Sequence, residues 1–207
     1  MNWSFAGITR PAQNQSRLLE LPAEIREAIF AFAVVSEKPI VTFKLDQYQK
    51  DSYQEARQPA ITRVSRQVRS ESLPIYYDCN DFIIHTEGAK SDDASRWLMC
   101  NEKHLNALRH LTFWIRYIPF VHERLSSQGA LGISVARPVK HGCWKVDDRW
   151  KWITVVRKPQ TLTRDADFLI GHFKKALINE STVSIDSEAF VEMIEGVRKQ
   201  YAKEKSV

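Results

Sequence analysis

The sequence has few of the residues on which small secreted domains and phosphate-binding loops depend. Its 207 residues include 3 cysteines, 7 glycines and 8 prolines. Three cysteines make no disulfide framework, so we expect a reducing compartment, the cytoplasm or the nucleus. The scarce glycines form neither Gly-x-Gly-x-x-Gly nor a P-loop, and no Gly-x-Ser-x-Gly elbow occurs. These absences favour a binding protein without a cofactor over an enzyme, although a noncontiguous active site stays an alternative.

Long apolar runs are also missing. The longest, Ala28 to Val35, is too short to cross a bilayer, so we expect no membrane segment. Residues 1–17 lack the continuous apolar stretch of a secretory signal and are predicted to be a flexible arm.

What the chain does have is an ordinary globular composition, with 43% hydrophobic and 27% charged residues. Its net charge of +5 permits a nucleic-acid or acidic partner without demanding one. Helical and strand patterns alternate without a regular βαβ rhythm, which predicts an α+β fold. We expect a single domain over residues 18–201, divided into 18–115 and 116–201, and a frayed tail at 202–207.

The clearest helix signal covers residues 22–35, where Pro22 suits the first turn. Its apolar residues recur at i, i+3, i+4, i+7 and i+8 and define one face: Ile25, Ala28, Ile29, Phe32 and Ala33. We expect Leu21, Ile25 and Ile29 to pack against Val64 and Val68 of a second helix. Glu24 or Arg26 is expected to pair with Arg69 or Glu71 across that contact.

Further patterns predict the remaining elements. A second helix begins at Pro59 and is ended or kinked by Pro74. Caps at Ser91, Thr163 and Ser187 predict a third helix and two carboxy-terminal helices. Strands are expected at 40–43, 82–86, 111–115 and 132–135, with a loop at 46–58. Residues 143–156 are predicted to form a hairpin that turns at Asp147-Asp148.

Two segments in order carry a family resemblance. The first runs Leu21-Pro22-Ala23-Glu24-Ile25-Arg26-Glu27-Ala28-Ile29-Phe30, and the second covers Ile61 to Tyr77, followed by Asn80-Asp81-Phe82. Together with Leu105 to Phe113 they resemble the fungal F-box-like domains of the "two E-x-R" type. The resemblance covers residues 18–115. Between its two segments this chain inserts a predicted strand and a polar loop, where an F-box has a tighter helical link.

The resemblance implies a protein-protein interaction module, with docking on the Skp adaptor of a ubiquitin ligase and a target held by the carboxy-terminal half. It implies a partner-binding face on the first helix, composed of Leu21, Pro22, Glu24, Ile25, Arg26 and Ile29. The expected partners are therefore an adaptor and a target protein.

The predicted hairpin offers an alternative function. Tryptophans alternate there with cations, and such a pattern can stack bases and neutralise phosphates: Trp144, Lys145, Trp150, Lys151 and Trp152. The same pattern also fits an inner aromatic face with solvated lysines opposite.

Two pairs of potential metal ligands occur in the sequence. Cys100 and His104 are four residues apart, and His141 and Cys143 are two apart, but these spacings match no standard zinc pattern. We therefore expect no metal and three ordinary buried thiols. The neighbouring acids Asp92-Asp93 and Asp147-Asp148 are expected to be capping and turn groups.

Overall fold

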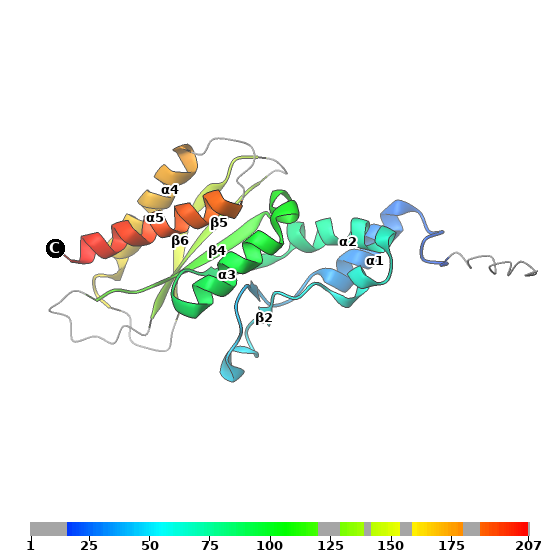
Figure 1. Ribbon diagram of the computed structural model, residues 1–207, viewed down its shortest axis with the longest axis horizontal. Coiled ribbons are helices and arrows are strands. Elements are labelled where there is room, and N and C mark those ends of the chain that lie inside the picture. Colours follow the sequence, from blue (N-terminus) through cyan, green and yellow to red (C-terminus); the bar gives the residue numbers. More distant parts are fainter. Residues whose placement is uncertain (1–15, 120–128, 139–141, 154–158, 180–186, 207) are drawn as a thin grey trace, which may run out of the picture.

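The computed structural model describes residues 16–119, 129–138, 142–153, 159–179 and 187–206. The predicted flexible arm at 1–17 lies outside these residues except for its last two. Figure 1 shows two parts. Helices α1 and α2 project from a larger body that holds the sheet and the other helices, and this pair of helices, which is distinct from residues 1–17, is called the arm below.

The described residues confirm the α+β class with a mixed sheet. Its six strands run β2-β1-β3-β4-β5-β6; β1 to β4 pair in parallel, and β5 and β6 pair antiparallel. The strands are β1 (Ile40–Val41), β2 (Gln54–Glu55), β3 (Asp81–His85), β4 (His110–Arg116), β5 (Ala130–Ala136) and β6 (Lys145–Ile153). The α-helices are α1 (Ala23–Val34), α2 (Arg66–Cys79), α3 (Gly88–Cys100), α4 (Leu162–Asn179) and α5 (Ser187–Lys205). Three 3₁₀ helices are η1 (Gln47–Gln49), η2 (Ala60–Arg63) and η3 (Glu102–Ala107).

The main core lies between one face of the sheet and the three helices α3, α4 and α5 (Figure 1). Phe82, Phe113 and Ile133 point into it from the strands, and Leu98 and Phe173 meet them from the helices. A smaller cluster covers part of the opposite face: Val41, Phe43, Leu45, Ile83, Trp114 and Ala130.

Helix α1 lies within one residue of its predicted bounds at each end, but its packing differs from the prediction. Its buried residues are Phe30 and Val34, whereas Ile25 and Ile29 are exposed. Val64, the expected partner of that face, is 72% exposed, and only Val68 is buried. The prediction that the apolar stripe packs against the second helix is therefore wrong. Helical spacing identifies residues that share a face, but it does not say which face meets a neighbour.

Helix α2 also differs from its prediction. Pro59 precedes η2, and α2 begins only after Ser65, whose hydroxyl accepts a hydrogen bond from the Val68 amide at 3.1 Å. Pro74 does not end α2, which continues to Cys79 because Tyr76 and Tyr77 are anchored in the core.

The other predicted caps and boundaries shift by a few residues. Helix α3 begins at Gly88, before the predicted cap Ser91. Thr163 lies inside α4, and Ser187 is the first residue of α5. Within the loop predicted at 46–58, the structure places η1 and β2.

The predicted hairpin at 143–156 is wrong, because its described part is the single strand β6. Val146 pairs with Val135 and Trp150 pairs with Ile133, so Asp147 to Arg149 lie opposite a single β5 residue. The Arg149 amide donates a hydrogen bond to Asp147 Oδ1 at 2.9 Å. The turn chemistry of Asp147-Asp148 is thus used in a bulge of an edge strand. Residues 154–156 lie outside the described part of the chain.

The tail differs as well, since α5 extends to Lys205 where fraying was expected from residue 202. The ammonium of Lys205 is fully buried and donates to Asp165 of α4 at 2.7 Å. It also lies over the ring of Tyr117, 4.9 Å from the ring centre. A buried ion pair holds the last turn in place.

Candidate functional site

The arm is held together by a charged contact between its two helices. Arg26 on α1 donates two hydrogen bonds to Glu71 on α2, from Nε at 2.8 Å and from Nη2 at 3.0 Å. Its third nitrogen, Nη1, donates to the Leu21 carbonyl at 2.6 Å. The bond from Arg26 holds the pKa of Glu71 below its ordinary value, and the bond to Glu71 raises the pKa of Arg26. The predicted pairing across the two helices is confirmed for Arg26 and Glu71.

At the other end of the arm, the buried side chain of Asn80, the residue just before β3, joins the carboxyl ends of the two helices. Its Nδ2 donates to the carbonyls of Val34 at 3.1 Å and Tyr76 at 2.7 Å, and its Oδ1 accepts from the Ser36 amide at 2.7 Å. The carboxyl ends of α1 and α2 therefore meet at one residue, next to the core residues Tyr76 and Tyr77 that hold α2 on the body.

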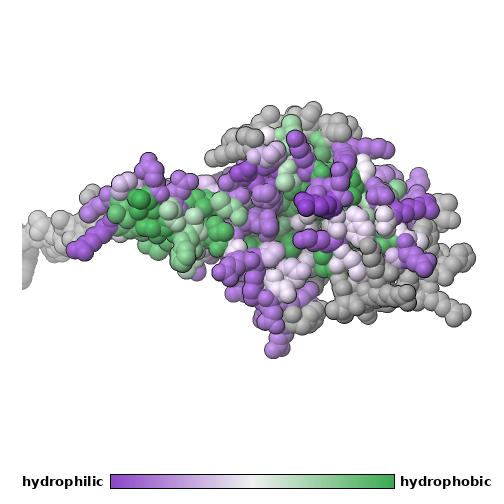
Figure 2. All heavy atoms as spheres, turned by 180° about the vertical axis from the view of Figure 1, so that it is seen from behind, coloured by the Kyte–Doolittle hydropathy of each residue, from purple (hydrophilic) through white to green (hydrophobic). Residues whose placement is uncertain are grey.

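This arrangement leaves an apolar surface on the arm open to solvent. Phe32 is 93% exposed and Ile25 is 50% exposed, and Figure 2 shows the hydrophobic colour gathered on the arm. We call the exposed apolar residues of α1 and its flanks the apolar docking face: Leu21, Ile25, Ile29, Phe32 and Val35. Large apolar side chains grouped in this way mark interaction sites more often than ordinary surface.

The partner-binding residues that the resemblance implies differ in their exposure to solvent. Leu21, Pro22, Glu24, Ile25 and Ile29 are exposed, whereas the guanidinium of Arg26 is used inside the arm. The sequence motif omits Phe32, the most exposed large apolar residue of the described ranges, although its helical spacing places it on the same stripe.

The tryptophan-rich segment packs inward. The ring of Trp144 meets Phe190 edge-on at 5.9 Å and lies under the guanidinium of Arg137, 4.6 Å from the ring centre. Trp150 and Trp152 pack against the main core, and Trp152 meets Tyr117 edge-on at 5.8 Å. Lys145 and Lys151 are exposed on the opposite side of β6. The strand therefore has an inner aromatic face with solvated lysines opposite.

The candidate metal ligands are not assembled in the described residues. Cys79, Cys100 and Cys143 are all exposed, so the expectation of buried thiols is wrong. His104 stacks on Tyr77 with ring centres 4.9 Å apart. No group of three His, Cys, Asp or Glu side chains that could hold a metal occurs in the described ranges, and His141 lies outside them.

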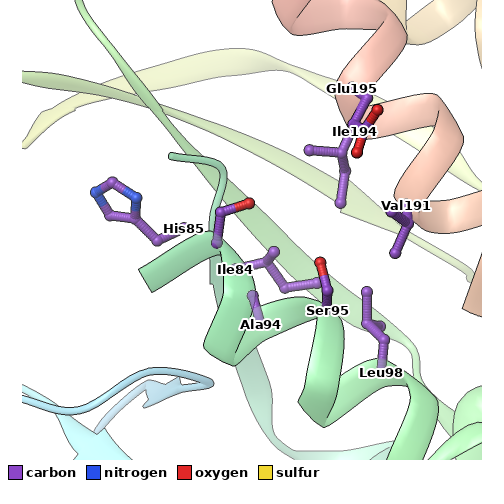
Figure 3. Close-up of a pocket in the computed structure, with 9 residues that line it drawn as sticks. Ile84, His85, Ala94, Ser95, Leu98, Val191, Ile194 and Glu195 are labelled. Carbon is purple, nitrogen blue, oxygen red and sulfur yellow. The ribbon is translucent and has the colours of Figure 1, made fainter. Parts of the chain in front are cut away.

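A small hollow lies where α3, α5 and the end of β3 meet (Figure 3). Ile84, Ala94, Leu98, Val191 and Ile194 supply its apolar lining, which leaves about 10 Å³ for the centres of water molecules. That space holds no more than one water. The His85 ring points away from the hollow and meets Phe43 edge-on at 5.5 Å. His85 and Glu195 therefore do not face each other across it.

Two shallow grooves are larger but open to solvent. One, of about 340 Å³, lies between α3 and the segments around β1 and β2, and the other, of about 410 Å³, follows the end of α1. The second groove includes Val35 and so continues from the apolar docking face.

No helix within the described ranges is both long enough and apolar enough to span a bilayer. No protein-family model matches the chain, and neither a curated protein nor a solved structure matches it.

Proposed function

We propose that this protein is a non-catalytic protein-recognition module that docks on a partner through the apolar docking face of α1. The observation that supports this proposal is that the apolar docking face points outward into solvent. The two-helix arm presents five large apolar side chains of α1 and its flanks to solvent, Ile25 and Phe32 among them, whereas Met99 is the one strongly exposed large apolar residue on the described part of the body. Burial of such side chains against a partner is the main favourable term in association.

The partner that the F-box-like resemblance implies is a Skp-type adaptor, which would make the protein a ubiquitin-ligase substrate receptor. Two features support this proposal. The residues of the first motif lie on a projecting arm, and three of its apolar members, Leu21, Ile25 and Ile29, are exposed, whereas Phe30 is buried. The inserted strand and loop belong to the body, since β1 joins the sheet beside β3, so they do not cover the apolar docking face.

The test uses the purified full chain and a Skp-type adaptor at micromolar concentration, measured by calorimetry. We expect a complex that Ile25→Asp and Phe32→Asp each weaken about 30-fold or more, because a charge replaces an apolar anchor. The matched control is Met99→Asp, on α3, whose side chain is 66% exposed outside the arm. We expect that variant to bind like the wild type.

Absence of a complex with the folded wild-type chain would reject the ubiquitin-ligase role. Affinity purification from the native cell then tests the wider proposal. Proteins retained by the wild type and by Met99→Asp, but not by Phe32→Asp, would support protein recognition through α1. Identical retention by all three would reject it.

Nucleic-acid binding through Trp144, Trp150 and Trp152 is the less supported alternative. Stacking on bases needs exposed ring faces. These three rings pack against the main core instead.

A further inference from the structure

A second surface on the arm is cationic, and its arginines have no acidic partner among the residues that the structure describes. Arg63 ends η2, Arg66 opens α2, and Arg69 follows within the next turn, so the three are spaced three residues apart. All three side chains are exposed. None of them makes a side-chain hydrogen bond or a salt bridge to any residue in the described ranges.

Glu71, the acidic residue that follows these arginines most closely in the sequence, already accepts hydrogen bonds from other residues. Glu71 accepts both hydrogen bonds from Arg26 and a further one from Gln67 Nε2 at 3.0 Å. Within the described ranges, Glu71 is therefore taken by Arg26 and Gln67 and does not pair with Arg63, Arg66 or Arg69.

Lys103 extends the same surface towards the body. It is exposed on η3 and has no salt bridge to a described residue. Its neighbour His104 stacks on Tyr77 with ring centres 4.9 Å apart, and Tyr77 lies two turns after Arg69 on the same side of α2, so η3 brings Lys103 to the side of the helix that carries Arg69. The charges of Arg69 and Lys103 also lower the pKa of His104, after the larger effect of its burial. Because like charges at this spacing repel each other, the cluster is suited to an anionic partner.

The chemistry of the surface favours a protein partner over a nucleic acid. Val64, at 72% exposure, stands between Arg63 and Arg66 in the chain and adds an apolar contact. Phe32 of α1 is the single aromatic residue among the strongly exposed large hydrophobic residues of the described ranges, so the cationic surface lacks a stacking platform for bases. Guanidinium groups bind carboxylates with two parallel hydrogen bonds.

We propose that Arg63, Arg66, Arg69 and Lys103, with Val64 among them, form a docking surface for an acidic segment of a partner protein. This surface goes beyond the function proposed above, because it does not require the apolar docking face of α1. It gives the arm two independent contact surfaces, one apolar and one cationic.

The experiment measures fluorescence anisotropy of a short labelled peptide of alternating Glu and Leu with the full chain. The comparison probes are a Lys-Leu peptide and an oligothymidylate of equal length. We expect the Glu-Leu peptide to bind most tightly, and binding to weaken as salt is added. The variant Arg63→Glu, Arg66→Glu, Arg69→Glu should lose about tenfold or more in affinity, because three attractive contacts become repulsive.

The matched control reverses the same number of charges on the body: Lys145→Glu, Lys151→Glu, Lys175→Glu. These lysines are exposed and have no salt bridge to a described residue. We expect this variant to change peptide affinity less than twofold. If the arginine variant is less stable than the wild type, replacement of the same three residues by Gln takes its place, with a smaller loss in the same direction.

Equal weakening by the two charge-reversal variants would overturn the proposal, since net charge would then explain the binding. Tighter binding of the oligothymidylate, lost in the arginine variant, would also overturn it and assign the surface to nucleic acid. Phe32→Asp separates the two proposals: it should weaken the adaptor complex and leave peptide binding unchanged.

Discussion

Arg26 and Glu71 join the two helices of the arm through parallel hydrogen bonds of 2.8 and 3.0 Å. The same guanidinium donates to the Leu21 carbonyl, so one side chain holds α2 and the start of α1 together. Arg26 lies one turn before Phe30 and two turns before Val34, on the side of α1 that faces α2. By occupying that side, these three residues leave Ile25, Ile29 and Phe32 exposed.

The pair gives a first prediction, on pH dependence. The pKa of Glu71 is lower in the folded chain, so its contribution is complete above its unfolded pKa of about 4.3 and is lost as pH falls through the folded pKa. Glu71→Gln should lower the melting temperature at neutral pH, and the difference from the wild type should shrink in acid. Thermal unfolding at several pH values measures it. A constant difference across the acid range would contradict the assigned role. Glu27→Gln, exposed on α1, is the control.

A second prediction concerns the buried ion pair between α4 and α5. Lys205→Ala leaves Asp165 buried without its cation and should cost about 3 to 5 kcal/mol of unfolding free energy. Arg164→Ala is the matched control, because it breaks an exposed ion pair with Glu204 between the same helices and should cost at most about 1 kcal/mol. Denaturant unfolding measures both. Similar losses of unfolding free energy in the two variants would show that the buried Lys205–Asp165 pair contributes no more to stability than the exposed Arg164–Glu204 pair.

A third prediction concerns the pH dependence that His104 contributes, a basic side chain where Glu71 is an acidic one. Burial, and then the charges of Arg69 and Lys103, lower its folded pKa. The unfolded chain therefore binds this proton more readily, and stability falls as pH drops below about 6.5 towards the folded pKa. His104→Gln should remove that part of the pH dependence, and Arg69→Gln should reduce it. NMR titration of His104 checks the pKa directly, and a value above the ordinary histidine range would contradict the prediction.

Two glycines should respond oppositely to alanine. A Cβ on Gly129 would overlap ring atoms of Trp152, so Gly129→Ala should destabilise the chain by about 1 to 3 kcal/mol. Gly171 in α4 has open space around its Cα, and Gly171→Ala should stabilise the helix by about 0.5 to 1 kcal/mol. Denaturant unfolding of both variants measures the change in unfolding free energy. If Gly129→Ala leaves that free energy unchanged, the Trp152 ring can move aside.

Much of the local structure follows from the sequence. The bounds of α1 follow from Pro22 and the apolar spacing, and the α+β class follows from the mixture of patterns. The pairing of Arg26 with Glu71 could be expected because opposite charges flanked two apolar stripes. These features depend on residues near in sequence or on simple complementarity, so local patterns carry enough information to predict them.

The tertiary structure decided the rest. Periodicity made Ile25, Ile29 and Phe32 share a face, but only the packing of the other side of α1 against α2, through Arg26, Phe30 and Val34, left that face in solvent. Asp147-Asp148 has the chemistry of a turn, yet pairing with the full length of β5 offsets that preference and keeps β6 as one bulged strand. Tail residues such as Lys205 have no local signal for burial, because their partner Asp165 lies 40 residues away. Long-range contacts override local preference at these positions, since each contributes more free energy than the local choice costs.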